Sequence, residues 1–481
     1  MDPATRSANK PQGSRNKSTA ETGIRPLGAF FCLWKFVLLS IAVLSPGPGY
    51  DTSTQILLQQ YQALSGSWLE QLVSKLTRWD AIYFANSSAR GHVFEQEWAF
   101  SRFSARITSQ IARVFPFTHI QSAILRHAAA GIVLSHISHF LAVIVLYQLT
   151  CELIPASHER KRQIAFTAAC LHIVSPGGLF LSASYGESFF ALTSFAGSFC
   201  YVASWRNGSA QHPESGLHAA RWAIISGVLF GTATTVRGNG LLSGIMFAWD
   251  AVLYVPKLPK ILRERASTDI LRLFGLLIGG AMIAVGYAIP QIEAYLEYCT
   301  GGNARPWCSK IPPSIYTFVQ AHYWNVGFLK YWTLPNIPLF ALAAPMLLVL
   351  LSTGWVAMSR GQLEKLVIAL NVAGDSNHAV AIAAQEKQAF SHQMARFALP
   401  QLVLAGLALT SFHVQIINRI SSGYPVWYIL LACAMHMPGD ATKNTSAAMS
   451  FFARNAQWLV RASVMYAMIQ GGLYASFMPP A

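Results

Sequence analysis

The chain has 481 residues, of which 53% are hydrophobic and only 11% are charged. A soluble domain of this length needs more charge to cover its surface, and the apolar residues here fall in blocks long enough to cross a bilayer as helices of roughly 20 residues. The formal net charge of +15 lies largely beside these blocks, as the positive-inside rule describes, and no basic face interleaved with aromatic residues points to nucleic acid. Composition therefore excludes a soluble, nucleic-acid-binding protein.

An all-α membrane protein is expected, because backbone polar groups in lipid must be paired within the element that spans it. Residues 1–26 are polar and basic and are predicted to form a disordered cytosolic tail, followed by one multi-pass transmembrane domain over residues 27–481. The first apolar block, residues 27–44, is interpreted as a signal anchor, since a long tail precedes it and no small-residue cleavage site follows. This orientation places residues 46–121 outside the cytosol, in the lumen of the endoplasmic reticulum.

The remaining apolar blocks bring the predicted number of membrane helices to about ten, several of them short. In chain order they cover residues 122–149, 164–174, 184–205, 222–254 (two helices broken near residues 237–240), 273–290, 337–358, 397–412, 424–435 and 457–477. Residues 291–336 are predicted to form a second luminal segment, and residues 360–396 a cytosolic loop. Cys299 and Cys308 flank a polar loop in the luminal segment, where an oxidising environment would allow a disulfide.

Three carboxylates cluster among aromatic residues in the first luminal segment. The two strings are RWDAIYF (78–84) and HVFEQEWAF (92–100), which contain Asp80, Glu95, Glu97 and Trp98. Aromatic walls suit sugar rings and lipid head groups, and a carboxylate can accept a hydroxyl proton. The alternative is an interfacial aromatic belt in which Asp80 pairs with Arg78 or Arg90.

Two further polar motifs interrupt apolar stretches. Glu187 lies in SASYGES (182–188), and Arg237 lies in VRGNG (236–240) together with Asn239. Ionisable residues at membrane depth are functional candidates, and Arg237 needs an anionic partner, either Glu187 or a ligand phosphate. The alternatives are a hairpin turn capped by Glu187 and a buried Arg–Glu pair that fixes helix packing.

A third aromatic string, HYWNVGF (322–328), contributes His322 and Trp324. With Asn418, Arg419 and Tyr424 it could line the same chamber as the first luminal segment. A lone histidine such as His322 is more often structural than catalytic. No Cys and His spacing typical of a metal site is visible, so no metal ligand is predicted and the metal requirement stays open.

As a set, these strings resemble the GPI mannosyltransferase 2 family, in a fungal form. The matching pieces are RWDAIYF, HVFEQEWAF, SPGGLFLSASYGESFFALTSFAG, RGNG, HYWNVGFLKYWTLPNIPLFALAAP and ASFMPPA, in the family's order. The N-terminal tail and residues 361–392 do not match. The resemblance implies an endoplasmic reticulum membrane enzyme with the multi-pass GT-C fold and a luminal active site.

The resemblance also implies a reaction. The donor would be dolichyl-phosphate mannose and the acceptor a GPI precursor that bears one mannose, joined in an α-1,6 linkage. Inversion at the sugar carbon needs one displacement and one general base, unlike the carboxylate pair of a glycosidase. Asp80 is assigned as this base. Glu95 and Glu97 would orient the sugars, Arg237 would hold the donor phosphate, and Trp98, Glu187, Asn239, His322 and Trp324 complete the predicted substrate-binding set.

Other interpretations remain open at this stage. A different polyprenyl-phosphate-dependent glycosyltransferase would share these features, and a multi-pass transporter would share the broken spans and buried charges. No internal repeat typical of transporters is present. A non-catalytic scaffold would have no use for Asp80. Membrane lipid is an expected partner, and a small membrane subunit is a candidate one.

Overall fold

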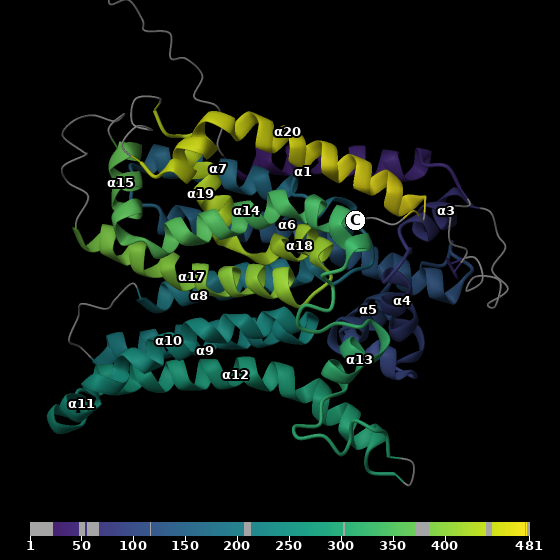
Figure 1. The fold of residues 1–481 in the computed structure, drawn as a ribbon, viewed down its shortest axis with the longest axis horizontal. Helices are drawn as coiled ribbons and strands as arrows, with labels where there is room; N and C mark the ends of the chain where they lie inside the picture. Colours follow the sequence, from purple (N-terminus) through teal and green to yellow (C-terminus); the bar gives the residue numbers. More distant parts are fainter. Residues whose placement is uncertain are drawn as a thin grey trace, which may run out of the picture.

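The computed structural model describes residues 23–47, 53–54, 67–115, 117–205, 213–301, 304–371, 384–438, 445–476 and 478. All regular elements in these ranges are helices, which confirms the predicted all-α class. Six helical stretches of the described residues are long and apolar enough to cross a membrane. The predicted number of about ten is not confirmed by this criterion, although α7, α8, α17 and α20 run alongside the six (Figure 1).

The α-helices of the described residues come from the whole length of the chain. In chain order they are α1 (Ile24–Leu44), α3 (Trp68–Lys75), α4 (Ala81–Arg90), α5 (Arg102–Val114), α6 (Ala123–Leu153), α7 (His158–Ile173), α8 (Glu187–Trp205), α9 (Pro213–Val236), α10 (Gly244–Tyr254), α11 (Leu258–Glu264), α12 (Ser267–Tyr298), α13 (Ile315–Tyr323), α14 (Ile337–Met358), α15 (Arg360–Asn371), α17 (Ala384–Thr410), α18 (Ile417–Ile420), α19 (Pro425–Met435) and α20 (Ala447–Ala475).

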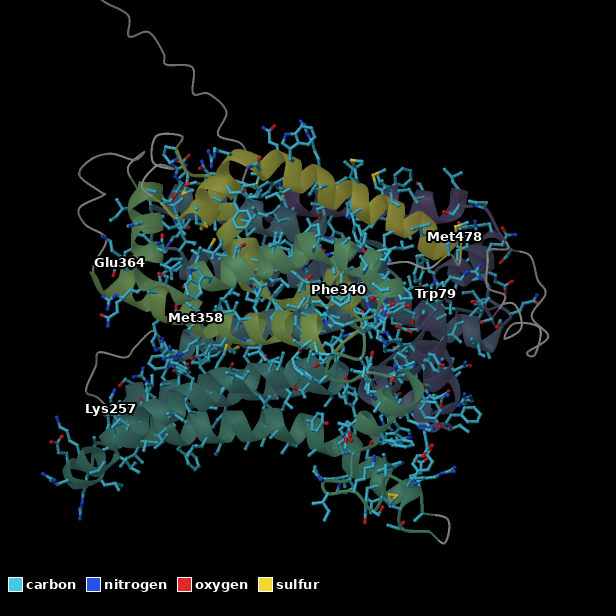
Figure 2. All side chains as sticks on the ribbon, in the orientation of Figure 1. Trp79, Lys257, Phe340, Met358, Glu364 and Met478 are labelled. Atoms are coloured by element: carbon cyan, nitrogen blue, oxygen red, sulfur yellow. A yellow bond between two sulfur atoms is a disulfide. The ribbon has the colours of Figure 1, made fainter. Side chains whose placement is uncertain are left out.

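The long helices lie roughly along the longest axis of the molecule, with short helices at both ends (Figure 1). At one end are α3, α4, α5 and α13, which come from the two segments predicted to be luminal. At the other end are α11 and α15, the second of which comes from the segment predicted to be cytosolic. Trp79 lies toward the first end, called the α4 end below, and Lys257 and Glu364 lie at the opposite end (Figure 2).

Small residues allow α9 and α12 to pack with their backbones in contact. A Cβ atom added to Gly227 of α9 would lie 2.3 Å from the Cα atom of Gly279 in α12, and one added to Gly286 would lie 2.2 Å from the Gly231 carbonyl oxygen. Close backbone approach through small residues is how membrane helices gain packing energy without a hydrophobic driving force. With α10, this pair forms a layer beside the remaining helices (Figure 1).

Several boundaries differ from those predicted. The chain is helical from Ile24, so the helix begins three residues before the predicted start; the rest of the predicted tail, residues 1–22, lies outside the described residues. The helix predicted at 273–290 is longer, because α12 runs from Ser267 to Tyr298 and continues past Pro290. The predicted break near residues 237–240 is confirmed, with a 3-10 turn, η3 (Gly238–Ser243), between α9 and α10.

The prediction that residues 360–396 form a loop is wrong for the described part of that segment. It contains α15 and the first half of α17. Leu363, Leu366, Val367 and Leu370 are buried, at the spacing of one helix face. The flanking polar residues Arg360, Gln362, Glu364, Lys365 and Asn371 obscured this periodicity in the sequence.

Candidate active site

Asp80 occupies the N-cap position of α4 at the α4 end of the molecule. The residue before it, Trp79, has a φ of 56°, a left-handed conformation that is uncommon for a bulky residue and that concentrates at functional sites. The Tyr474 hydroxyl, from α20, is 3.1 Å from both the Leu76 and the Arg78 carbonyl oxygens. The Tyr185 hydroxyl also donates to the Arg78 carbonyl. The backbone around Asp80 is therefore held by α20 and by the turn before α8, both distant in sequence.

Glu187 is the first residue of α8, where the partial positive charge of the helix N-terminus favours a carboxylate. The polar turn before it is tied to two membrane helices. Lys35 of α1 donates to the Leu181 carbonyl (2.9 Å) and to the Ser182 hydroxyl oxygen (2.7 Å), and Ser135 of α6 donates to the Ala183 carbonyl (2.7 Å). This turn brings the Glu187 side chain, which is 0% exposed, into the interior.

Arg237 follows the last residue of α9 in an extended conformation. The turn after it needs glycine, since a Cβ atom at Gly240 would lie 2.6 Å from the Thr234 backbone nitrogen. Arg237 Nη1 is 2.7 Å from Glu187 Oε1. The anionic partner that Arg237 was expected to need is thus Glu187.

Arg419 of α18 joins this pair to Asp80. Its Nη2 atom donates to Asp80 Oδ2 at 2.9 Å, and its Nε atom is 3.4 Å from Glu187 Oε1. The guanidinium lies over the rings of Phe180 (4.9 Å) and Tyr185 (5.5 Å). Arg419 is thus a partner of Asp80, and Arg90, one of the two partners proposed in the alternative interpretation, pairs instead with Glu97.

The four charged residues form one chain of ion pairs, in the order Asp80, Arg419, Glu187, Arg237. They come from four segments far apart in sequence, and their formal charges sum to zero. Asp80 is the most accessible, with 36% of its side chain exposed, whereas Glu187 is fully buried between two guanidiniums. A neutral cluster with one accessible carboxylate can accept a proton from a ligand and place positive charge beside an anion.

Asn239 lies at the edge of this cluster. Its side-chain amide donates to the Tyr424 hydroxyl (3.1 Å), and that hydroxyl is 3.3 Å from the Asn239 carbonyl oxygen. The contact links η3 to the N-terminus of α19. Asn239 therefore fixes the position of the turn that carries Arg237.

An aromatic wall begins one helical turn after Asp80. Tyr83 stacks on Phe100 with ring centroids 4.7 Å apart, and Phe100 meets the edge of the Trp324 ring at 5.7 Å. All three side chains are half-buried. Burial raises the pKa of Tyr83, and the charges of Asp80 and Glu97 act in the same direction, so its hydroxyl stays protonated as a hydrogen-bond donor.

Glu97 and Trp98 are buried in the segment between α4 and α5, and not beside Arg419. Glu97 accepts hydrogen bonds from Arg90 (2.6 Å to Oε1) and from the Val93 backbone (2.7 Å to Oε2). Burial acts to raise the pKa of Glu97, but these hydrogen bonds outweigh it and hold the pKa below its usual value. Trp98 is 4% exposed with Arg102 over its ring. Their contacts give no support to the predicted sugar-binding roles.

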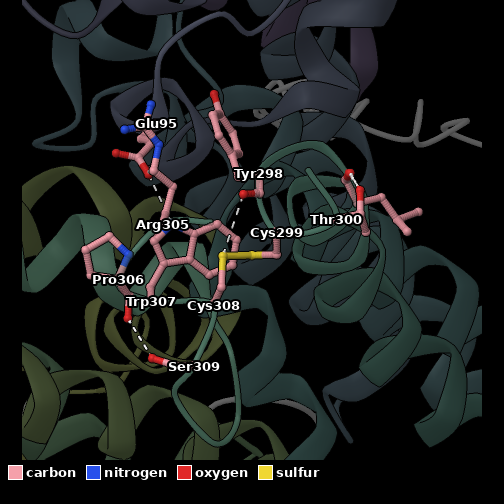
Figure 3. The surroundings of a disulfide bond; sticks show 10 residues. Glu95, Tyr298, Cys299, Thr300, Arg305, Pro306, Trp307, Cys308 and Ser309 are labelled. Carbon is pink, nitrogen blue, oxygen red and sulfur yellow. Dashed lines mark hydrogen bonds and ion pairs between the residues drawn. A yellow bond between two sulfur atoms is a disulfide. The ribbon is translucent and has the colours of Figure 1, made fainter. Parts of the chain in front are cut away.

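Glu95 faces the disulfide-closed loop (Figure 3). Cys299 and Cys308 form the disulfide that an oxidising lumen would allow. Trp307, between them, donates to Glu95 Oε1 (3.1 Å), Arg305 is 3.6 Å from the same oxygen, and Tyr323 donates to Oε2. Glu95 thus connects this loop to the segment between α4 and α5.

His322 is exposed and stacks on Phe318 with ring centroids 5.0 Å apart. Of the predicted residues, the structure brings together Asp80, Glu187 and Arg237, with Asn239 and Trp324 at the edges. His322 lies apart in α13, and the group of Glu95, Glu97 and Trp98 lies in the 3-10 turn η1 (Glu95–Ala99). Within the described ranges, no group of three or more His, Cys, Asp or Glu side chains is arranged to hold a metal ion.

Arg419 is the residue that the sequence-based site set lacked. Asn418 and Arg419 were expected only to line the chamber loosely. The available signal was an arginine in a short polar break between two apolar blocks, where a buried charge demands a partner. Its partner is 339 positions away, which no local pattern indicates.

Comparison with known proteins supports a common origin over almost the whole chain. GPI mannosyltransferase 2 of Gibberella zeae is 41% identical, covering 95% of this chain and 98% of that protein, and GPI mannosyltransferase 2 of Aspergillus oryzae is 40% identical, covering 95% and 96%. GPI mannosyltransferase 2 of Schizosaccharomyces pombe is 30% identical, covering 94% and 84%.

Among solved structures, the archaeal oligosaccharyltransferase AglB from Archaeoglobus fulgidus, in complex with an inhibitory peptide and a dolichol-phosphate, aligns with a TM-score of 0.46 at 12% identity. The alignment covers 93% of this chain and 56% of the AglB chain. Residues 24–481 match the family described as mannosyltransferase (PIG-V). The chain is therefore a member of the mannosyltransferase (PIG-V) family of membrane enzymes.

Proposed function

We propose that this protein adds the second mannose, in α-1,6 linkage, to a GPI-anchor precursor, with dolichyl-phosphate mannose as the donor. The reaction would take place on the luminal side of the endoplasmic reticulum membrane, within a GT-C type helical bundle. The observation that carries the proposal is the chain of ion pairs that ends in the accessible carboxylate of Asp80. Full-length similarity to proteins named GPI mannosyltransferase 2 supports the acceptor class.

Asp80 is proposed as the general base. In the displacement, the acceptor hydroxyl gives its proton to the Asp80 carboxylate while its oxygen bonds to the mannose C1 atom. The bond from C1 to the phosphate oxygen breaks, and its electron pair leaves with the phosphate. Because the attack comes from the face opposite the leaving group, a β-linked donor gives an α product, and one base suffices.

Arg237 is proposed to hold the donor phosphate. Its side chain is 19% exposed, so it can contact a ligand while one of its nitrogen atoms remains beside Glu187. Guanidinium groups bind phosphate through paired N–H donors. Glu187 would fix the direction of this guanidinium and of Arg419.

Tyr83, Phe100 and Trp324 are proposed to face the acceptor sugar. Their rings form a continuous wall that starts one turn from Asp80, and the Tyr83 hydroxyl can donate to a sugar oxygen. Glu95, Glu97, Trp98 and His322 stay in the proposal only as residues that shape the luminal surface around this wall. A small membrane subunit remains a candidate partner.

Depletion of the protein in cells tests the substrate and the step. A GPI precursor with a single mannose should accumulate, because its next acceptor position would go unused. Accumulation of a precursor with no mannose, or with two or more, would place the enzyme at a different step. Unchanged precursor levels would argue against a role in this pathway.

Substitution of Asp80 tests the base. Asp80→Asn should lower mannosyl transfer in membranes by roughly 100-fold or more, the usual contribution of a positioned general base, at unchanged protein level. Asp269→Asn is a matched control, because Asp269 lies in the first turn of α12, whose start is at the opposite end of the bundle. Near-normal turnover by Asp80→Asn would remove Asp80 from this role.

A further inference from the structure

Arg419 lies between Asp80, the proposed base, and the pair of Glu187 and Arg237, which is proposed to hold the phosphate. Neither of these roles explains the presence of Arg419. It pairs with Asp80 through Nη2 and approaches Glu187 through Nε. The Nε atom is buried and has no aligned hydrogen-bond acceptor among the described residues. The Nε atom therefore pairs with the Glu187 carboxylate without an aligned hydrogen bond, and a guanidinium held in this way can gain a better acceptor that arrives with a ligand.

The charge balance of the proposed reaction identifies that partner. Before transfer, Asp80 carries one negative charge and the donor phosphodiester carries one. After transfer, Asp80 is protonated and neutral, and the released polyprenyl phosphate is a monoester with a second ionisable oxygen. One negative charge therefore moves from the carboxylate to the leaving phosphate as the bonds change.

We propose that the Arg419 guanidinium exchanges its ion-pair partner during the reaction. It pairs with Asp80 in the resting site and with the leaving phosphate in the transition state. This inference rests on the proposed function and adds the residue that neutralises the leaving group. Stabilisation that grows as charge develops raises the rate of the chemical step and not the affinity for the substrate.

The position of Arg419 suits such an exchange. The faces of Phe180 and Tyr185 hold the guanidinium from one side, which keeps it oriented without using its N–H groups. Its side chain is 14% exposed, next to the more open Asp80. A ligand that reaches Asp80 therefore meets Arg419, and Arg237 lies on the other side of Glu187.

Substitutions of Arg237 and Arg419 should therefore have different effects on kcat and on the donor KM. Arg237 binds the donor phosphate before reaction, so Arg237→Gln should raise the donor KM by about tenfold or more with a smaller change in kcat. Arg419→Gln should lower kcat by roughly 100-fold and change the donor KM by less than about threefold. Arg419→Lys should recover part of the lost kcat, because it restores the charge without the fork geometry.

Product inhibition gives a second readout that a purely structural role would not alter. Polyprenyl phosphate carries the extra negative charge, so its inhibition constant should rise about tenfold in Arg419→Gln while the donor KM is nearly unchanged. Asn418→Ala is the matched control: Asn418 anchors α18 to the Tyr466 hydroxyl (3.0 Å) and to the Leu342 carbonyl. It should leave the ratio of the product inhibition constant to the donor KM unaltered.

The outcomes separate this inference from the function on which it rests. If Asp80→Asn is inactive but Arg419→Gln changes the donor KM and the product inhibition constant equally, Arg419 is only an anchor and the inference fails alone. The same conclusion follows if Asn418→Ala reproduces the Arg419→Gln ratio. If Asp80→Asn is active, the proposed base fails first.

Discussion

Two glutamates in this protein show how differently the same side chain is used. Glu187 contacts two guanidiniums at the centre of the site, with no exposed surface. Glu97 is also buried, but its carboxylate closes a local turn through Arg90 and the backbone of Val93 and Phe94. Both are acidic residues in aromatic surroundings, and only their partners distinguish a site residue from a structural one.

Glu97→Gln should lower the thermal stability of the purified protein, by about 2 kcal/mol at neutral pH, because buried donors lose a charged acceptor. The folded protein holds the pKa of Glu97 below its usual value of 4.5. Its contribution is therefore present above about pH 4.5 and is lost as the pH falls through the lower pKa of the folded state. The Tm difference between wild type and variant, measured by tryptophan fluorescence, should shrink on acidification from pH 7 toward about pH 4.

Glu364→Gln provides the comparison, since Glu364 forms an exposed pair with Arg360 within α15. Exposed pairs of this kind contribute less than about 0.5 kcal/mol. Equal Tm losses in the two variants, or a Glu97→Gln loss that does not depend on pH, would contradict the structural role of Glu97.

At the scale of elements, helix α1 contributes a side chain that supports the candidate active site. Lys35 lies in the middle of α1, is 5% exposed, and has no carboxylate partner among the described residues. Its two acceptors belong to the turn that leads to Glu187. A buried ammonium group is expensive in lipid surroundings, so its retention here points to the positioning of that turn.

Lys35→Met should keep the packing volume of α1 and remove both hydrogen bonds to the turn. We expect kcat to fall by at least about tenfold, because a small displacement of the site is costly, while Tm stays level or rises, because a buried charge is replaced by an apolar chain. Mannosyl transfer and thermal unfolding, measured on the same preparation, test this.

Lys75→Met is the control for loss of a lysine near α1. Lys75 donates to the Val43 and Ser45 carbonyls at the end of the helix and not to the turn. Full activity in Lys35→Met, or an equal loss in both variants, would show that Lys35 does not position Glu187.

The sequence predicts those site residues that lie in a recognisable local motif. Asp80, Glu187 and Arg237 each stand in a short polar motif that interrupts an apolar stretch, and the glycines after Arg237 indicate the helix break that is observed. Arg419 has no comparable motif, because its role depends on contacts across the fold. Helix α15 and the first half of α17 were predicted as a loop for a related reason: the polar and charged residues around their buried positions resemble a loop until the packing partner is known.

At the scale of the whole molecule, the last helix, α20, holds the backbone of the segment that carries Asp80. Tyr474 of α20 reaches the backbone of Leu76 and Arg78, two to four residues before Asp80. It is 0% exposed and packs against the rings of Phe180 and Tyr185. The aromatic residues that support Arg419 and the backbone that supports Asp80 are thus parts of one cluster.

Tyr474→Phe should keep the ring contacts and remove the hydroxyl. We expect a stability loss of about 1 kcal/mol for the lost hydrogen bond, together with a drop in kcat as the Asp80 backbone loosens. The exposed Tyr295 of α12 offers the control Tyr295→Phe, which should change neither quantity. Unchanged kcat in Tyr474→Phe would show that the Asp80 backbone is held by other contacts.

The contact between Asp80 and Arg419 also determines when the candidate active site can form during biosynthesis. Asp80 leaves the ribosome early, whereas Arg419 follows 339 residues later and Tyr474 later still. A chain that ends between Asp80 and Arg419 contains the carboxylate but lacks both the arginine and the Tyr474 hydroxyl that contacts the backbone before Asp80. Competence for mannosyl transfer should consequently arise in one late step of membrane insertion, so that partly synthesised chains carry no residual activity.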